Sequence, residues 1–144
     1  MIVWIERALA LAIHERQLAE HGGGNGVRDE ALLESALARP QQLHADGNPP
    51  PDLADITASV AFVFARNHPF VDGNKRTAHV CYRVFLALND AQLVGNEEEK
   101  YLQMLTLAEG SLSEADFAVW LRSRLRLESG KAVHEPKVRY RRGR

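Results

Sequence analysis

Apolar residues recur along this chain at intervals of three and four positions, a pattern that predicts amphipathic helices. The first such stretch covers residues about 3–20, and three glycines after His21 end it. A second, short helix is expected after Asp29, whose side chain can accept from the free N–H groups of the following turn, and it should stop before Pro40. Residues 40–52, which include three consecutive prolines, are expected to form a loop.

The middle of the chain predicts two longer helices with a wide apolar face. Asp52 is placed to cap a helix that runs to about Asn67, and residues about 74–88 repeat the helical spacing. The loop between them, residues 68–73, interrupts both patterns and has an unusual composition.

Two further helices complete the prediction. One follows the acidic run at residues 97–99 and is closed by Gly110, and the other opens at Ser113 and runs through Leu125. Alternation typical of strands is confined to residues 92–94. The pattern therefore predicts an all-α fold, a compact bundle of about six helices in which a central helix begins directly after the middle loop.

Length and composition place the chain among single-domain globular proteins. The 144 residues fit one core, and 45% apolar against 26% charged residues excludes a wholly disordered chain. The single cysteine, Cys81, excludes an internal disulfide and a cysteine cluster for zinc or iron–sulfur. There is no basic leader, and no apolar run approaches the roughly 18 residues that a membrane span needs, so we expect a cytoplasmic protein with no membrane partner.

Charge divides the chain unequally. Residues 1–128 hold 12 Lys and Arg against 18 Asp and Glu, whereas residues 129–144 hold 6 against 1. We therefore expect a helical domain over residues 1–128 and a basic, flexible tail over residues 129–144, because the tail has too few large apolar residues to bury itself. A solvated tail is the simpler interpretation, and weak binding of nucleic acid is the alternative.

The segment from His68 to Thr77 combines a histidine, a carboxylate, a glycine, an amide and two cations within ten positions. Pro69 keeps His68 out of helical geometry, and Phe70 can point inward and anchor the loop. His68 would then stand at the rim, where a neutral imidazole can take the proton from an attacking hydroxyl.

The second half of this segment has the composition of an anion site. Gly73 and Asn74 lie where the next helix begins, so unpaired N–H groups and the positive end of the helix dipole would face a docked anion, and Lys75 and Arg76 add two charges. This set suits a polyphosphate better than a single carboxylate. Asp72 would repel a bare polyphosphate, but a bridging Mg²⁺ removes the conflict, so the loop predicts a nucleotide with magnesium.

Each of these residues also has a simpler structural explanation. A histidine at a helix–loop junction is commonly a hydrogen-bonded structural residue, an aspartate before glycine is commonly a turn residue, and a Lys-Arg pair in a first helical turn is commonly solvated. A P-loop is excluded, because that motif needs an earlier glycine and a preceding strand that this segment lacks. The other histidines, including His14 and His21, show no metal-ligand spacing.

Residues His68 to Thr77 match the signature His-x-Phe-x-Asp/Glu-Gly-Asn-x-Arg, and the chain therefore resembles the Fic/Doc superfamily. The resemblance to the Doc (death-on-curing) branch extends to residues 21–23, 26–29, 32–40 and 108–110, and it covers roughly residues 1–127. It implies a compact Fic-like helical bundle and an enzyme that transfers part of a nucleoside triphosphate to a protein hydroxyl.

The resemblance also implies a role for each residue of the signature, with ATP as substrate and Mg²⁺ as cofactor. By position, the catalytic base is His68, the magnesium ligand is Asp72, and the phosphate-binding residues are Gly73, Asn74, Lys75 and Arg76.

Two positions bear on which group is transferred. Fic enzymes that transfer AMP usually have glycine where this chain has Lys75 and a second arginine where it has His79, which favours transfer of a phosphoryl group by a Doc-like kinase. Gly73 is shared with the Fic enzymes, so nucleotidyl (AMP) transfer is the alternative.

The resemblance further implies partners. Many Fic proteins carry an inhibitory Ser/Thr-x-x-x-Glu helix, and no glutamate of this sequence has Ser or Thr four residues before it. A toxin of a type II toxin–antitoxin system is therefore expected, restrained by a separate antitoxin and acting on a cytosolic translation factor such as elongation factor Tu. The competing hypothesis is a catalytically inactive module that binds an antitoxin and contacts DNA through its tail, and the intact signature argues against it.

Overall fold

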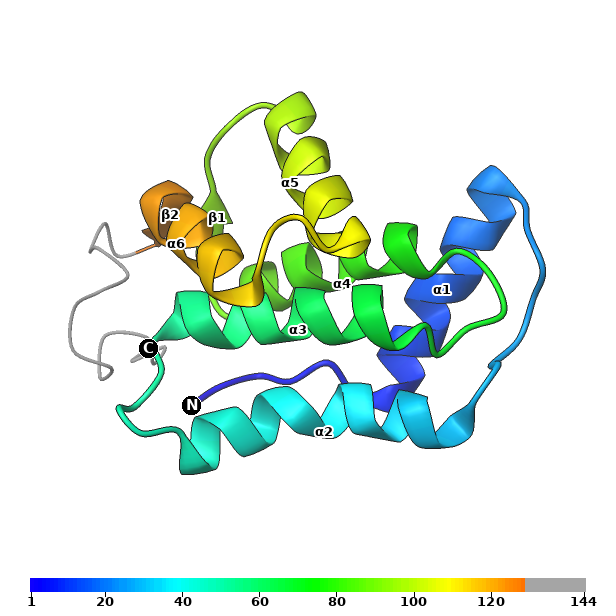
Figure 1. Ribbon diagram of the computed structural model, residues 1–144, viewed down its shortest axis with the longest axis horizontal. Helices are drawn as coiled ribbons and strands as arrows, with labels where there is room; N and C mark the ends of the chain where they lie inside the picture. Colours follow the sequence, from blue (N-terminus) through cyan, green and yellow to red (C-terminus); the bar gives the residue numbers. More distant parts are fainter. Residues whose placement is uncertain (129–144) are drawn as a thin grey trace.

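The computed structural model describes residues 1–128, which form six helices and one two-stranded sheet, and this confirms the predicted all-α class. The predicted tail, residues 129–144, lies outside the described residues. The elements in chain order are α1 (Arg7–His21), α2 (Glu30–Asp46), α3 (Leu53–Asn67), α4 (Asn74–Leu88), β1 (Ala91–Leu93), α5 (Glu97–Glu109), α6 (Glu114–Arg124) and β2 (Leu125–Leu127) (Figure 1).

Helices α3 and α4 form the centre of the bundle. Residues on every side of α3 are buried, because α2 covers one side and α4, α5 and α6 cover the others (Figure 1). α4 packs against α3 and also contacts α1, α5 and β1. The connection between α3 and α4 is therefore surrounded by several elements that can hold it in place.

Local capping signals predicted the starts of several helices correctly. Asp29 accepts from the backbone of the first turn of α2 at 3.0 Å, and Ser113 does the same for α6 at 3.0 Å. Asp52 and Asp55 form a reciprocal capping box at the start of α3, with bonds of 2.9 and 3.0 Å. Such caps depend only on residues three apart, which is why the sequence reveals them.

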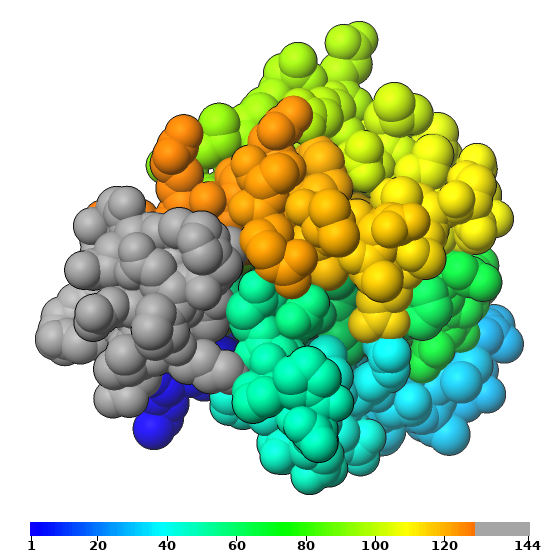
Figure 2. All heavy atoms as spheres, turned by 60° about the vertical axis from the view of Figure 1, so that its left-hand side comes forward, coloured from blue at the N-terminus to red at the C-terminus, as the bar shows by residue number. Residues whose placement is uncertain are grey.

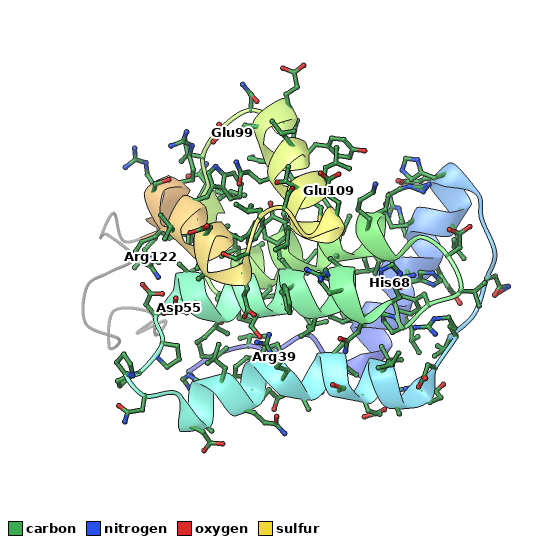
Figure 3. The ribbon with its side chains drawn as sticks, in the orientation of Figure 1. Arg39, Asp55, His68, Glu99, Glu109 and Arg122 are labelled. Atoms are coloured by element: carbon green, nitrogen blue, oxygen red, sulfur yellow. The ribbon has the colours of Figure 1, made fainter. Side chains whose placement is uncertain are left out.

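The start of α3 is also tied to α6. The Arg122 guanidinium donates to Asp52 at 2.7 Å and to Asp55 at 2.9 Å. Figure 2 shows the orange α6 against the teal beginning of α3, and Figure 3 marks Arg122 and Asp55 in the same corner of the molecule. α6 thus closes the bundle over the end of α3 that lies away from the connection to α4.

The expected stop before Pro40 and the expected loop over residues 40–52 are wrong, because α2 continues through Pro40 to Asp46. Proline removes one helical hydrogen bond and costs about 3 kcal/mol in a helix interior. Here the ring is buried beside Trp4, Val60 and Phe64, and this apolar burial offsets the loss. The loop between α2 and α3 is correspondingly shorter than expected.

The first helix begins at Arg7 instead of residue 3. The Asn89 side chain accepts from Val3 N at 2.8 Å and donates to Val3 O at 2.9 Å, so the residue after α4 holds this segment outside the helix. A partner so distant along the chain leaves no local signal.

The last helix ends at Arg124 rather than running through Leu125. Leu125 and Leu127 are buried and Arg126 is exposed, which is the alternation of a strand. This segment pairs antiparallel with β1, which lies one residue earlier than the predicted strand-like residues. Within residues 1–128, none of the helices has the length and apolar character needed to cross a membrane.

Candidate active site

The segment from His68 to Gly73 connects α3 to α4. His68 ends α3 in the left-handed region, with φ 52° and ψ 56°, which agrees with the expectation that Pro69 keeps it out of helical geometry. His68 is exposed, whereas Phe70 is 1% exposed and is buried in the core as predicted. The loop therefore presents His68 at the surface from a buried anchor.

The Asn74 side chain holds the middle of this loop. Its Oδ1 accepts from Phe70 N at 2.9 Å, and its Nδ2 donates to Phe70 O at 3.0 Å. Val71 N donates to Gly26 O at 3.0 Å, which joins the loop to the segment after α1. Because the amide of Asn74 is engaged with Phe70, its backbone N–H is the group that can face a phosphate.

Backbone N–H groups hold the Asp72 carboxylate from two sides. Gly73 N donates to Oδ1 at 2.8 Å and Gly24 N donates to Oδ2 at 3.2 Å. These two bonds, in that order, lower the pKa of the Asp72 carboxyl below its ordinary value. A Cβ added at Gly23, whose φ is 124°, would lie 2.8 Å from Oδ2, so the close approach of this glycine-rich segment requires glycine there.

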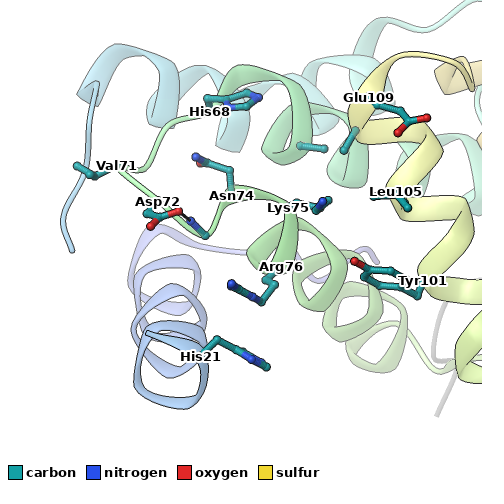
Figure 4. Close-up of a pocket in the computed structure, with 13 residues that line it drawn as sticks. His21, His68, Val71, Asp72, Asn74, Lys75, Arg76, Tyr101, Leu105 and Glu109 are labelled. Atoms are coloured by element: carbon teal, nitrogen blue, oxygen red, sulfur yellow. Dashed lines mark hydrogen bonds between the residues drawn. The ribbon is translucent and has the colours of Figure 1, made fainter. Parts of the chain in front are cut away.

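The signature residues border one pocket with a volume of about 750 Å³. Figure 4 shows Lys75 extended toward α5 and Arg76 turned toward His21 at the end of α1. The lining residues are His21, Ala65, His68, Val71, Asp72, Gly73, Asn74, Lys75, Arg76, Tyr101, Leu105, Ala108 and Glu109. All six residues predicted for the site thus lie around the same cavity. The expectation that the Gly73 N–H is unpaired is wrong, because it donates to the Asp72 carboxylate.

The opposite wall of this pocket comes from α5, and the sequence did not predict it. Tyr101 is 51% exposed, and Leu105, Ala108 and Glu109 follow along the same helix (Figure 4). Residues 108–110 share the resemblance to Doc, but no local pattern places residues 101–109 beside the signature, since only the packing of α5 near α4 brings them together. The wall is mainly apolar with a carboxylate at its end, in contrast to the polar loop that it faces.

Two other side chains support the loop from outside the pocket and were also missed. His14 Nε2 donates to Asp72 O at 2.8 Å, and Arg28 Nε donates to His68 O at 2.8 Å. The His14 ring is 3% exposed and stacks on Phe70 with centroids 3.9 Å apart. One signal was available for His14, because it shares the buried face of α1 with Ala10, Ile13 and Gln17 at helical spacing.

The donor set of the site would fit a magnesium ion that a substrate holds with its own oxygens. Within residues 1–128, no three His, Cys, Asp or Glu side chains cluster to form a metal site by themselves. Asp72 offers a single carboxylate whose ionised form is favoured by two N–H donors. Mg²⁺ commonly takes one or two carboxylates and completes its shell with phosphates and water, so this donor set suits a metal–nucleotide and not a free ion.

His79 of α4 contacts Tyr101, which belongs to the α5 wall. Arg83 donates to His79 Nε2 at 3.1 Å, and the His79 ring contacts Tyr101 edge-on at 6.3 Å between centroids. Burial, followed by the charge of Arg83, lowers the pKa of His79 to about 4. This position therefore adds no positive charge to the second turn of α4 at neutral pH.

Comparison with known proteins agrees with this geometry. The sequence profile of the Fic/DOC family matches residues 4–86, which include the signature and the segments that hold it. The chain is 32% identical over 114 residues to Protein kinase doc of Escherichia phage P1, covering 78% of this chain and 87% of that protein. It is 44% identical over 75 residues to Toxin Doc of Mycolicibacterium smegmatis, covering 52% of this chain and 58% of that protein.

The matched region spans more than half of the chain, and it includes His68, Asp72 and the cationic start of α4, which lie around one pocket. The chain belongs to the Fic/DOC family.

Proposed function

We propose that this protein is a Doc-type toxin that transfers a phosphoryl group from ATP to a hydroxyl of a cytosolic protein. The observation that carries the proposal is the convergence of His68, Asp72 and the first turn of α4 around one pocket of about 750 Å³. A general base, an anchored carboxylate and an anion site are the three parts that such a transfer needs.

Different residues around the pocket have different roles in the proposed phosphoryl transfer. The N–H groups at the start of α4, together with Lys75 and Arg76, bind and orient the phosphates. His68 takes the proton of the attacking hydroxyl, whose oxygen forms a bond to the γ-phosphorus while the bond to ADP breaks. Asp72 would hold Mg²⁺, which when bound neutralises charge on the phosphate oxygens.

Phosphoryl transfer is favoured over nucleotidyl transfer by the charges around the pocket. Lys75 extends into the cavity, and the neutral His79 stands where Fic enzymes that transfer AMP usually have arginine (Figure 4). The similarity to a protein named Protein kinase doc, over 87% of its length, supports the same choice. Nucleotidyl transfer is the runner-up.

A separate antitoxin and a translation factor are proposed as partners. The similarity to a protein named Toxin Doc supports a toxin, although the alignment spans 58% of that protein. No glutamate of the sequence has Ser or Thr four residues before it, so the inhibitory motif of many Fic proteins is absent, and restraint would come from another chain. Elongation factor Tu is the proposed target.

Labelled ATP tests this proposal directly. The purified protein is incubated with cell lysate, Mg²⁺ and ATP labelled at either the α or the γ phosphate, and Asp72→Asn serves as the control. We expect protein-bound label from the γ position only, and loss of label when EDTA removes Mg²⁺. Label from the α position would show nucleotidyl transfer, and no label from either position would support the inactive binding module.

A further inference from the structure

The loop that bears the signature begins and ends in the left-handed region of backbone conformation. His68 has φ 52° and Gly73 has φ 73°. Glycine adopts this region without a Cβ penalty, whereas a histidine stays there only when its surroundings hold it. The contacts at the two ends of the loop therefore decide where His68 and Asp72 point.

Arg28 makes the contacts at the first end. Its guanidinium donates through Nε to His68 O at 2.8 Å and through Nη2 to Asn67 O at 3.1 Å, and its backbone N donates to Pro69 O at 2.7 Å. The last carbonyls of a helix lack helical partners and form the negative end of its dipole, so a positively charged guanidinium is well suited to bind them. Arg28 thus binds the backbone before and after the His68 side chain.

His14 makes the matching contact at the other end. Its Nε2 donates to Asp72 O at 2.8 Å, and its ring lies parallel to Phe70, with 7° between the planes. The Asp72 carbonyl belongs to the same peptide group as the Gly73 N–H, which donates to the Asp72 carboxylate at 2.8 Å. By fixing this peptide, His14 fixes the direction from which the carboxylate is held.

We propose that Arg28 and His14 are positioning residues with separable effects, Arg28 holding the base His68 and His14 holding the Asp72–Gly73 peptide that receives the metal–nucleotide. Neither residue is among those that line the pocket, so each acts through the loop and not on the substrate. The inference rests on the proposed function, and it predicts that loss of Arg28 slows turnover whereas loss of His14 weakens nucleotide binding.

The Arg28 arm uses Arg28→Met in the full chain of 144 residues, which keeps much of the side-chain length and removes the donors. We expect kcat for phosphoryl transfer to fall about 10–100-fold, the usual cost of a lost supporting contact, with the Kd for Mg-ATP changed less than about threefold. Arg28→Lys should restore part of kcat because it returns one donor. The matched control is Arg7→Met, since Arg7 pairs with Glu30 and Glu34 outside the pocket.

The His14 arm uses His14→Phe, which keeps an aromatic ring against Phe70 and removes the hydrogen bond. We expect the Kd for Mg-ATP, measured by calorimetry, to rise about tenfold or more, while kcat at saturating nucleotide changes little. His14→Gln should restore part of the affinity, because its amide can donate to Asp72 O. Gln17→Leu is the control, since Gln17 is a buried polar residue one turn further along α1.

Nitrogen NMR of the unsubstituted protein provides a test that does not depend on folding of the variants. Because a carbonyl only accepts, the His14 ring must carry its proton on Nε2, and the ring-nitrogen shifts should show that tautomer. The proposal is overturned if Nε2 carries no proton, if His14→Phe binds Mg-ATP like the wild type, or if Arg28→Met keeps the wild-type kcat. Equal losses of affinity and turnover in both variants would also overturn the separation of roles.

The experiments distinguish failure of the proposed function from failure of this inference. If the wild type transfers no phosphate from ATP, the function is wrong, but calorimetry and the His14 tautomer still report on the contact. If the wild type is active and the two variants behave as their controls do, the function stands and the positioning roles are wrong.

Discussion

The two sides of the pocket are built in different ways. On one side, residues 68–76 are consecutive, and hydrogen bonds between the backbone and the side chains of Asp72 and Asn74 hold them in place. On the other side, residues of α5 project from one helix face, and most of them are apolar. The polar residues whose chemistry depends on the distances between their atoms thus belong to the segment whose backbone is held by hydrogen bonds.

The α5 side is attached to the rest of the molecule mainly by packing. Met104, Leu107, Phe117 and Leu121 are fully buried where α5 and α6 meet the central helices. The ion pairs that accompany this packing, such as Arg124 with Glu99 at 2.7 Å, are partly exposed and stabilise only modestly. Under the proposed function, the loop side supplies the base and the contacts to metal and phosphate, and the α5 wall adds apolar contacts that help to bind the nucleotide.

Among the substitutions that test this comparison, replacing His68 is expected to have the largest effect on turnover. His68→Ala removes the proposed base, and loss of a general base typically lowers turnover by about 10²–10⁴-fold. Since His68 is exposed, the midpoint of thermal unfolding should stay close to that of the wild type. The readouts are γ-label transfer and growth arrest on expression without an antitoxin.

His44→Ala is the control for this substitution, because His44 contacts Trp4 from α2 and does not line the pocket. Full activity of His68→Ala would remove the base from the proposed mechanism. The loop would then remain a proposed anion-binding site, and no residue would be assigned to the proton transfer.

The order of elements on the loop side of the pocket could be predicted from the sequence because the signals that place these elements are local. Pro69 restricts the residue before it, Gly73 opens a helix, and Asp52 caps another, and each effect acts over three residues or fewer. Once these elements are placed, the charges of Lys75 and Arg76 necessarily lie near the start of α4. How these side chains lie around one cavity depends in addition on distant residues, namely Arg28 and His14, which hold the loop, and the α5 wall.

Features that depend on distant partners could not be predicted. Pro40 continues α2 while buried in a region that it shares with Trp4, Val60 and Phe64, and the strand at Leu125 depends on pairing with β1. Tyr101 joins the pocket only because α5 packs beside α4. In each case the stabilising contact comes from a residue far along the chain, and local propensity alone pointed to another structure.

Replacing Tyr101 should have a smaller effect and should act on a different kinetic constant. Tyr101→Ala removes an exposed ring from the α5 wall, and an aromatic contact contributes about 0.5–1.5 kcal/mol. We therefore expect the KM for ATP to rise about 3–10-fold with kcat nearly unchanged. Initial rates over a range of ATP concentrations measure both constants.

Leu102→Ala is the matched control for Tyr101→Ala, because Leu102 is the next residue of α5, is 55% exposed and does not line the pocket. A fall in kcat as large as that of His68→Ala would contradict the division between the two sides, since it would place a wall residue in the reaction step.

The smallest expected effect concerns the contact between the two sides, where His79 of α4 meets Tyr101 of α5. The pKa of His79 is about 4 in the folded protein, below the ordinary value of 6.5, so the unfolded chain takes up the proton first as pH falls. His79 should therefore leave the free energy of unfolding unaffected above pH 6.5 and lower it as the pH goes from 6.5 toward 4.

Urea unfolding at pH 7, 6 and 5 measures this loss for the wild type and for His79→Gln, whose amide can still accept from Arg83. We expect the wild type to lose about 1 kcal/mol more than the variant by pH 5, a value reduced for the partial exposure of the ring. Equal losses in the two proteins would mean that a charged His79 is tolerated at this contact, and then the neutrality of the position could no longer be used to favour phosphoryl over nucleotidyl transfer.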